Sequence, residues 1–384
     1  EIASWLYLRA AAATPDSAAR AALYARVRLK VARQRIPWVE AGARERFTDT
    51  LGAIAAYRAL PAPVTVFRLR AGTGAAARDS VRAELDAFLQ SSTTGDAIRE
   101  GSALFDKLYT DPTPAEQIVI ARAAARVGLW TLARAGFEAT VESALSDTDR
   151  FSFATSLSRT NASRRAADVY GRVRAPASLA FAARYQAARA LLAAGDASGA
   201  RSMLDALATA ASDTNGAAAL ALIADLQTDD GDDAASRKTL RTLVQRFPGT
   251  RFAPPARFNA ALISLILGET STAEKEFGEL ATTNSTDALA AEYWLGRARQ
   301  SAGNTSGAHE AWRAVLKRDS TSYYASLAAA RLGVQSMHSS SVSTGYPRVA
   351  SVDSALLRVS LLRELVMTPE AQWENDQLYP QATR

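Results

Sequence analysis

The chain has 384 residues and a formal net charge of +6 at pH 7, with 48% hydrophobic and only 8% aromatic residues. It contains no cysteine and two histidines, so a disulfide framework and a cysteine-ligated zinc site are both excluded. Only five of the 45 basic residues are lysines, and the excess of arginine and alanine favours helices, because both are strong helix formers.

The charged residues and the apolar runs exclude further classes of protein. The arginines are spread among acidic residues and form no patch, so we expect no nucleic-acid partner. The longest apolar run, residues 260–267, is far shorter than the roughly 20 residues of a membrane span, so no transmembrane segment is expected. His309 and His338 stand alone in the sequence, and we expect neither a metal site nor a cofactor.

Residues 1–115 form the first expected region, a set of irregular helical hairpins. An alanine precedes a large apolar residue by four positions at Ala53 and Tyr57, a spacing that recurs farther along the chain. The stretch 61–70 alternates enough to be a strand. Because it lies between helical hairpins, we expect it to open a helix after Pro63 instead.

Residues 116–334 are periodic, and this periodicity is the most informative feature of the sequence. A small residue precedes a bulky apolar one by four positions in six copies, whose bulky residues are 33, 34, 36, 37 and 35 positions apart. Nine positions before each bulky residue stands glycine or asparagine, which tolerate a positive φ at a helix end. The pairs are Ala133/Phe137, Ala166/Tyr170, Ala200/Leu204, Ser236/Leu240, Ala273/Phe277 and Ala308/Trp312, and the turn residues are Gly128, Asn161, Gly195, Gly231, Gly268 and Gly303.

This pattern predicts a helix–turn–helix unit that is stacked many times. The small residue lets two helices approach closely, and the bulky side chain fills the groove of its neighbour. A single hairpin cannot bury its apolar face alone, so the hairpins must stack. The expected first helices are Leu179–Ala194, Ala217–Thr228, Pro255–Leu267 and Ala288–Ala302, and the second helices are Ala197–Ala211, Ala234–Phe247, Thr270–Thr282 and Ser306–Lys317.

An acidic run at residues 229–233 (Asp-Asp-Gly-Asp-Asp) falls in one of these turns. It lacks the residue order of a calcium loop and the glutamate that closes one. It occupies the same position in its unit as Gly195-Asp196 and Gly268-Glu269. We therefore expect a structural turn, in which an aspartate caps the next helix.

Two further segments complete the chain. Residues 335–349 contain three consecutive serines and Gly345-Tyr346-Pro347, which predicts a loop or linker. Residues 350–384 contain a final helical pair, expected at 352–366 and 369–378.

The period and the spacing match those of the tetratricopeptide repeat (TPR). Residues 293–298 (Tyr-Trp-Leu-Gly-Arg-Ala) supply the Trp-Leu-Gly part of that signature in one unit. We therefore predict an all-α fold, a right-handed superhelix (α-solenoid) of TPR-like hairpins.

A second resemblance is carried by residues 319–333 (Asp-Ser-Thr-Ser-Tyr-Tyr-Ala-Ser-Leu-Ala-Ala-Ala-Arg-Leu-Gly). This stretch resembles the segment that ends the helical superhelix of soluble lytic murein transglycosylases, where it follows a Tyr-Trp-x-x-Arg-Ala helix like residues 293–298. Residues 355–374 resemble that family's connector to its catalytic domain. The resemblance implies the non-catalytic superhelix of a periplasmic enzyme, with residues 350–384 leading toward a catalytic domain absent from this chain and with its signal peptide removed or outside the sequence.

Enzymes of that family cleave the peptidoglycan bond between N-acetylmuramic acid and N-acetylglucosamine and leave a 1,6-anhydro end. Their acid and base is a single glutamate in a Glu-Ser-x-Phe motif. The one Glu-Ser pair here, Glu142-Ser143, is followed by Ala-Leu. We therefore expect no catalytic residue in this chain, and whether the parent protein is an enzyme stays open.

Aromatic and basic residues near the end of the repeats are the candidate binding residues, although side chains at such spacing more often form core. They are Tyr293, Trp294, Arg297, Tyr323, Tyr324 and Arg331. The first hypothesis makes peptidoglycan glycan strands the ligand of this scaffold, with other envelope proteins as further partners. The alternative is a TPR protein–protein adaptor in envelope assembly or cell division, and the third hypothesis is a cytoplasmic scaffold.

Overall fold

The computed structural model describes residues 1–210, 214–283, 285–334 and 349–378, and every regular element in these ranges is a helix. The chain divides into two units, one made of Glu1–Gly128 with Val342–Arg384 and the other of Leu129–Ser341. No helix in the described ranges combines the length and the apolar character that crossing a membrane requires. The expected boundary at residues 115/116 falls inside α9 (Pro114–Arg126), a helix that the contacts assign to the first unit.

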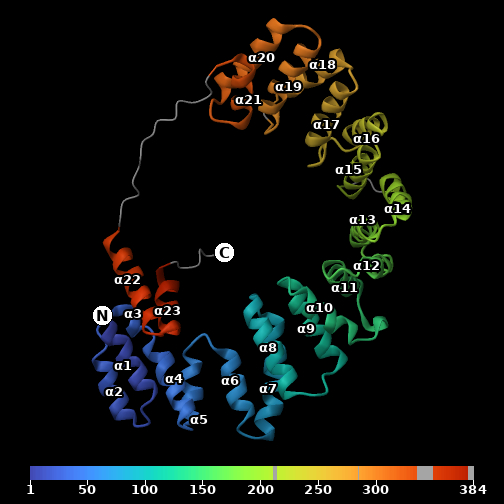
Figure 1. Cartoon of the computed structure of the whole chain (residues 1–384). Coiled ribbons are helices and arrows are strands. Elements are labelled where there is room, and N and C mark those ends of the chain that lie inside the picture. Colours follow the sequence, from blue (N-terminus) through green and yellow to red (C-terminus); the bar gives the residue numbers. More distant parts are fainter. Residues whose placement is uncertain (211–213, 284, 335–348, 379–384) are drawn as a thin grey trace. The chain divides into compact units, whose positions relative to one another are not determined.

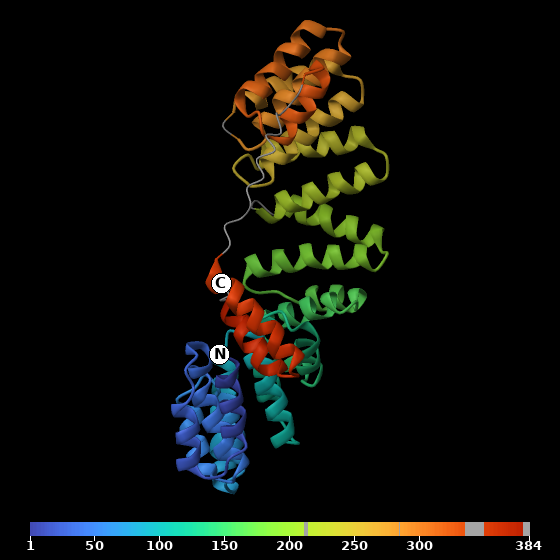
Figure 2. The same cartoon turned by 60° about the vertical axis from the view of Figure 1, so that its left-hand side comes forward.

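The second unit is a stack of helical hairpins, in which each helix contacts the next one along the chain (Figures 1 and 2). Successive first helices also contact one another, as α11 does with α13 and α13 with α15. The elements are α10 (Trp130–Glu138), the short 3-10 helix η1 (Glu142–Ala144), α11 (Asp147–Arg159), α12 (Ser163–Tyr170), α13 (Ala177–Ala193), α14 (Ala197–Ala210), α15 (Thr214–Asp229), α16 (Asp233–Arg246), α17 (Ala253–Ile266), α18 (Thr270–Ala281), α19 (Ala288–Ser301), α20 (Thr305–Arg318) and α21 (Tyr323–Leu332). The predicted helices of the repeats are thus confirmed to within a few residues.

The turn residues have the backbone conformation that the sequence predicts. All six have a positive φ, which a glycine adopts without a steric penalty and which asparagine tolerates. The angles are 77° at Gly128, 62° at Asn161, 81° at Gly195, 79° at Gly231, 77° at Gly268 and 82° at Gly303. This regular reversal of the chain sets the position of every second helix against its first helix.

The paired small and bulky residues form the core of the stack, as predicted. The small members are at most 1% exposed, and the bulky members are at most 5% exposed. Trp312 of α20 is fully buried beside Tyr293 and Val315, and its indole Nε1 donates a hydrogen bond to the Tyr293 carbonyl oxygen at 3.2 Å. Because this indole lies directly against α19, the facing residue there must be small.

That facing residue is Gly296, and its lack of a side chain is a requirement of the packing. A β-carbon at Gly296 would lie 2.4 Å from Nε1 of Trp312, well inside van der Waals contact. Gly278 of α18 offers a contrast, because a β-carbon there would meet nothing within 4 Å. The two glycines therefore separate the packing effect of a methyl group from its effect on helix propensity.

We predict opposite effects for the same substitution at these two positions. Gly296→Ala should destabilise the protein by about 1–3 kcal/mol, because Trp312 has no room to move. Gly278→Ala should stabilise it by up to about 1 kcal/mol, the difference in helix propensity between the two residues. Urea unfolding followed by circular dichroism measures both, and a stabilising Gly296→Ala would show that the two helices do not approach this closely.

Ion pairs join neighbouring repeats at a second recurring position. The residue directly after the small core residue pairs with the next repeat, as Arg201 does with Asp230 and Arg237 with Glu269. At the equivalent position of α18 the charges are exchanged, and Glu274 accepts from Arg299 at 2.9 Å. Each exposed pair adds little stability, but the column fixes the register of one hairpin on the next.

Three local predictions have clear outcomes. The acidic turn is structural, because the Asp232 side chain caps α16 by accepting from the Ala235 amide at 3.0 Å. Residues 63–71 form a helix, so the alternative of a strand is wrong. The expected loop at 335–349, including His338, lies outside the described residues except for its last position.

The first unit combines both ends of the sequence. Its N-terminal helices bury Val81, Leu85 and Leu89 of one helix and Ile98 and Phe105 of the next. The elements are α1 (Ile2–Ala12), α2 (Ser17–Ala25), α3 (Lys30–Arg33), α4 (Ile36–Arg46), α5 (Thr50–Arg58), α6 (Pro63–Ala71), α7 (Ala75–Ser91), α8 (Gly95–Leu108), α9 (Pro114–Arg126), α22 (Ala350–Glu364) and α23 (Thr368–Leu378).

The C-terminal pair α22 and α23 packs on the N-terminal helices, where red meets blue in Figure 1. Val359 and Leu362 share one buried cluster with Trp5. Polar contacts cross the same interface, including an ion pair of Arg9 with Glu370 at 2.8 Å. The sequence predicts the two helices, and the structure adds that they complete the core of the first unit.

Glu374 lies at the centre of this interface and is 1% exposed. It accepts a hydrogen bond from Nε1 of Trp5 at 3.1 Å and forms an ion pair with Arg358, which also pairs with Glu1. Because charged groups are stable inside a protein only when they are paired, Arg358 and Glu374 depend on each other.

Candidate ligand-binding surfaces

The structure brings most of the predicted aromatic residues together at α19 and α21. The rings of Tyr293 and Tyr324 are 5.7 Å apart, and those of Tyr323 and Tyr324 are 5.4 Å apart. Tyr293 is only 4% exposed, whereas Tyr323 is 72% exposed. Tyr293 is therefore a core residue, and Tyr323 is the ring of this cluster that is exposed to solvent.

Trp294 extends the cluster toward the preceding repeat. It is partly buried and stacks on Phe277 with 6.4 Å between ring centroids and an interplanar angle of 20°. The Arg297 guanidinium also lies over the Trp294 ring, 5.6 Å from the ring centroid. Arg331 is exposed and has no contact with the other five among those that the structure records.

Burial has a chemical consequence for one of these tyrosines. It raises the pKa of Tyr324 further above the usual value, which alone keeps a phenol protonated at neutral pH. A protonated phenol beside the exposed Tyr323 ring offers a hydrogen-bond group next to a flat apolar face. Such a surface suits stacking against a ring or packing against an apolar side chain.

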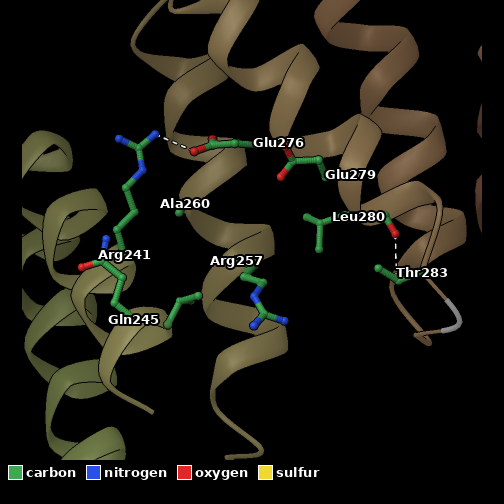
Figure 3. A pocket seen from close by; sticks show the side chains of 9 residues that line it. Arg241, Gln245, Arg257, Ala260, Glu276, Glu279, Leu280 and Thr283 are labelled. Carbon is green, nitrogen blue, oxygen red and sulfur yellow. Dashed lines mark hydrogen bonds and ion pairs between the residues drawn. The ribbon is translucent and has the colours of Figure 1, made fainter. Parts of the chain in front are cut away.

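A hollow of about 440 Å³ lies between the second helices α16 and α18, with the first helix α17 behind it (Figure 3). No motif or spacing in the sequence marks the residues of this hollow as a candidate site. The residues that line it are Arg241, Val244, Gln245, Arg257, Ala260, Glu276, Glu279, Leu280 and Thr283. Charged and polar groups line the hollow, and the larger part of its surface is apolar.

One pair of charges in this hollow is already satisfied. Arg241 is paired with Glu276 at 2.6 Å, as the dashed line in Figure 3 shows. The buried Ser264 hydroxyl supports the pair by donating to the other Glu276 oxygen at 2.9 Å. This network fixes the Arg241 and Glu276 side chains in place.

The other two charges of the hollow have no such partner. Arg257 on α17 and Glu279 on α18 are both exposed, and neither forms an ion pair with a described residue. Figure 3 shows the two side chains on different walls of the hollow, with Leu280 beside them. The hollow therefore presents one available cation, one available anion and an apolar surface.

The described residues contain no group of three or more side chains arranged to hold a metal ion. His309 lies in the second helix α20, where its ring is 5.9 Å from that of Trp312. The Glu142-Ser143 pair lies in the short 3-10 helix η1, and Glu142 forms an ion pair with Arg172.

No protein-family model and no curated protein matches the chain. Among solved structures, the C-terminal part of a TPR repeat-containing protein from Cytophaga hutchinsonii is 12% identical, and the match covers 64% of this chain and 98% of that one with a TM-score of 0.43. The apo quorum sensor NprR from B. thuringiensis is 10% identical over 71% of this chain and 99% of that one, with a TM-score of 0.38. The TPR domain of P58(IPK) is 12% identical over 81% and 87%, with a TM-score of 0.27.

These likenesses concern the fold alone, and the chain's own helices and turns define it as a helical solenoid of TPR-like hairpins. The resemblance of residues 319–333 to lytic transglycosylases rests on the sequence alone.

Proposed function

We propose that the chain is a protein-interaction scaffold whose TPR-like repeats hold a segment of a partner protein. The observation that carries the proposal is the hollow at α16–α18, where Arg257 and Glu279 stay available beside the paired Arg241 and Glu276. The repeats around it bury their own core, so the hollow is a fixed surface and not a packing defect.

The chemistry of the hollow selects a peptide segment of mixed charge. Arg257 suits a carboxylate, because a guanidinium binds one with two parallel hydrogen bonds. Glu279 suits an ammonium or guanidinium group of the partner. Val244 and Leu280 line the same hollow and offer apolar contact surface beside the two charges. Complementary charges of this kind set specificity and orientation more than they set affinity.

Binding of short peptides to the full chain tests this proposal. Peptides with acidic and basic residues on either side of an apolar residue should bind more tightly than all-acidic or neutral ones at this hollow. Arg257→Ala and Glu279→Ala should each weaken the best such peptide about tenfold, which corresponds to about 1.4 kcal/mol. Arg313→Ala on α20, an exposed arginine outside the hollow, is the matched control and should leave the affinity unchanged. Equal affinity for all three variants would refute the role of the hollow.

A finer proposal follows from the sequence resemblance to lytic transglycosylases. In it, the scaffold works in the periplasm and presents peptidoglycan strands to a catalytic domain of the same protein. The 72% exposure of Tyr323, inside the resembling segment, supports it, because a sugar ring stacks on such a face. Co-sedimentation with purified sacculi tests it: Tyr323→Ala should reduce binding, Val334→Ala should not, and the chain alone should release no anhydromuropeptides. Unchanged binding of Tyr323→Ala would argue against the finer proposal and leave the protein-binding scaffold intact.

A further inference from the structure

A second hollow in the same unit, of about 350 Å³, has a different position and a different charge. It lies between two first helices, α11 and α13, and Tyr170 of the second helix α12 forms part of its wall. Its charged lining residues are Arg159 and Arg189, and no aspartate or glutamate lines it. This hollow is therefore positively charged, whereas the hollow at α16–α18 carries both signs.

Arg159 and Arg189 differ from the neighbouring arginines because no carboxylate neutralises their charges. The other arginines of α11 and α12 each pair with a carboxylate: Arg150 with Asp147, Arg164 with Asp196, and Arg165 with Glu138. Arg159 lies over the Trp130 ring at 6.0 Å, and Arg189 donates to the Gln186 side-chain oxygen at 3.3 Å. Neither arginine forms an ion pair within the described ranges, so both guanidiniums remain available to an anion.

Two further polar groups that line the hollow, on Gln186 and Ser158, are able to donate to an incoming ligand. Gln186 uses its side-chain oxygen for Arg189, which leaves its amide NH₂ as a donor. Ser158 lines the hollow with a hydroxyl that takes part in no hydrogen bond recorded for the described residues. Thr155 donates to the Phe151 carbonyl at 2.8 Å, so Tyr170 donates to Thr155 and completes a fixed wall.

Arg159 and Arg189 line the same hollow as the Tyr170 hydroxyl, and both charges act on that hydroxyl. Burial raises the pKa of Tyr170, and the charges of Arg159 and Arg189 both act against that rise. Two cations within reach of one buried hydroxyl repel each other in the absence of a ligand. An anion between them removes this repulsion and satisfies the donors around it.

We propose that Arg159 and Arg189 form a subsite for a side-chain carboxylate of an acidic partner segment. The hollow has room for one such side chain and its methylene groups against the Phe151 ring and Ala193. A nucleic-acid backbone needs a continuous basic strip, and the paired arginines around the hollow provide none. This inference rests on the proposed scaffold function and adds the chemistry of a second contact point.

The test uses the full chain and a rhodamine-labelled, C-terminally amidated peptide of alternating Glu and Ala, so that side chains supply the only carboxylates. Fluorescence anisotropy should show binding that weakens as salt rises. Arg159→Ala and Arg189→Ala should each weaken it tenfold or more, and Arg189→Glu should abolish it. Arg313→Ala, with the same loss of charge elsewhere in the unit, should leave it unchanged. Because Arg159 and Arg189 are exposed, their variants should keep the wild-type melting temperature.

Three results would overturn the inference. The first is that a peptide with Gln in place of Glu binds as tightly as the Glu peptide. The second is that both arginine variants bind the Glu peptide as tightly as the wild type does. The third is that a single-stranded oligonucleotide or inorganic phosphate displaces the labelled peptide at lower concentrations than the unlabelled Glu peptide does. Mixed-charge peptides that bind through Arg257 while the Glu peptide does not bind would reject this subsite and keep the scaffold function. If no peptide of either kind binds, both proposals fail.

Discussion

Replacing Trp312 with alanine should lower the free energy of unfolding of the repeat unit by about 3–5 kcal/mol, the range for removing a buried tryptophan. Trp312 is fully buried, belongs to the same cluster as Tyr293, Ala325 and Ala328, and fills the groove left open by Gly296. Because α19, α20 and α21 all contribute to this cluster, the substitution should loosen all three helices.

Urea unfolding followed by circular dichroism measures the loss for Trp312→Ala. Tyr323→Ala is the control, because that ring is 72% exposed and its removal should change the stability by no more than about 0.5 kcal/mol. A loss below about 1 kcal/mol for Trp312→Ala would mean that the bulky member of the repeated pair is not a core residue.

Glu374→Ala should destabilise the first unit by about 3–5 kcal/mol, because it leaves a buried charge without its partner. Arg358 is 14% exposed and would keep only Glu1, and the Trp5 indole would lose its acceptor. The effect should reach α1 and α22 together, because both contribute to one buried cluster.

Hydrogen exchange measured by mass spectrometry locates this effect. In Glu374→Ala, peptides from α1 and α22 should exchange faster, while peptides from α13 to α18 should not change. Glu364→Ala, the loss of an exposed carboxylate from α22, is the control and should behave as the wild type. Identical exchange in the two variants would contradict the assignment of Glu374 as the centre of the interface.

The repeats were predictable because their signals are local and recur. The positive φ at Gly195 or Gly268 and the burial of Ala200 with Leu204 both follow from residue types at a fixed spacing. Each copy of the pattern strengthens the others, so helices and turns are predicted to within a few residues. The column of ion pairs that includes Arg237 and Glu269 carries the same period and was open to the same reasoning.

The packing of α22 and α23 on the N-terminal helices was not predictable from the sequence. Trp5 and Glu374 are 369 positions apart, and no periodic pattern links them. A buried glutamate also looks the same in the sequence as an exposed one such as Glu364. The sequence of the final pair predicts two helices, but it does not name the helices on which they pack.

The candidate sites were also predictable only in part. The aromatic residues at 293–294 and 323–324 were named as candidates from their types, and they lie together because they fall in successive first helices of a stack. The hollows were not predicted, because the sequence does not show which arginines form ion pairs. Only the structure distinguishes Arg257 and Arg189, which form none with a described residue, from the arginines that do. With 40 arginines in the chain, residue type alone carries little information about a site.

The most direct test of the scaffold account is hydrogen exchange of the full chain with and without a saturating mixed-charge peptide. The account predicts slower exchange of the bound protein in peptides from α16, α17 and α18, and no change in those from α1 to α9. Protection confined to the first unit, or no protection at saturation, would contradict the claim that the TPR-like repeats hold the partner.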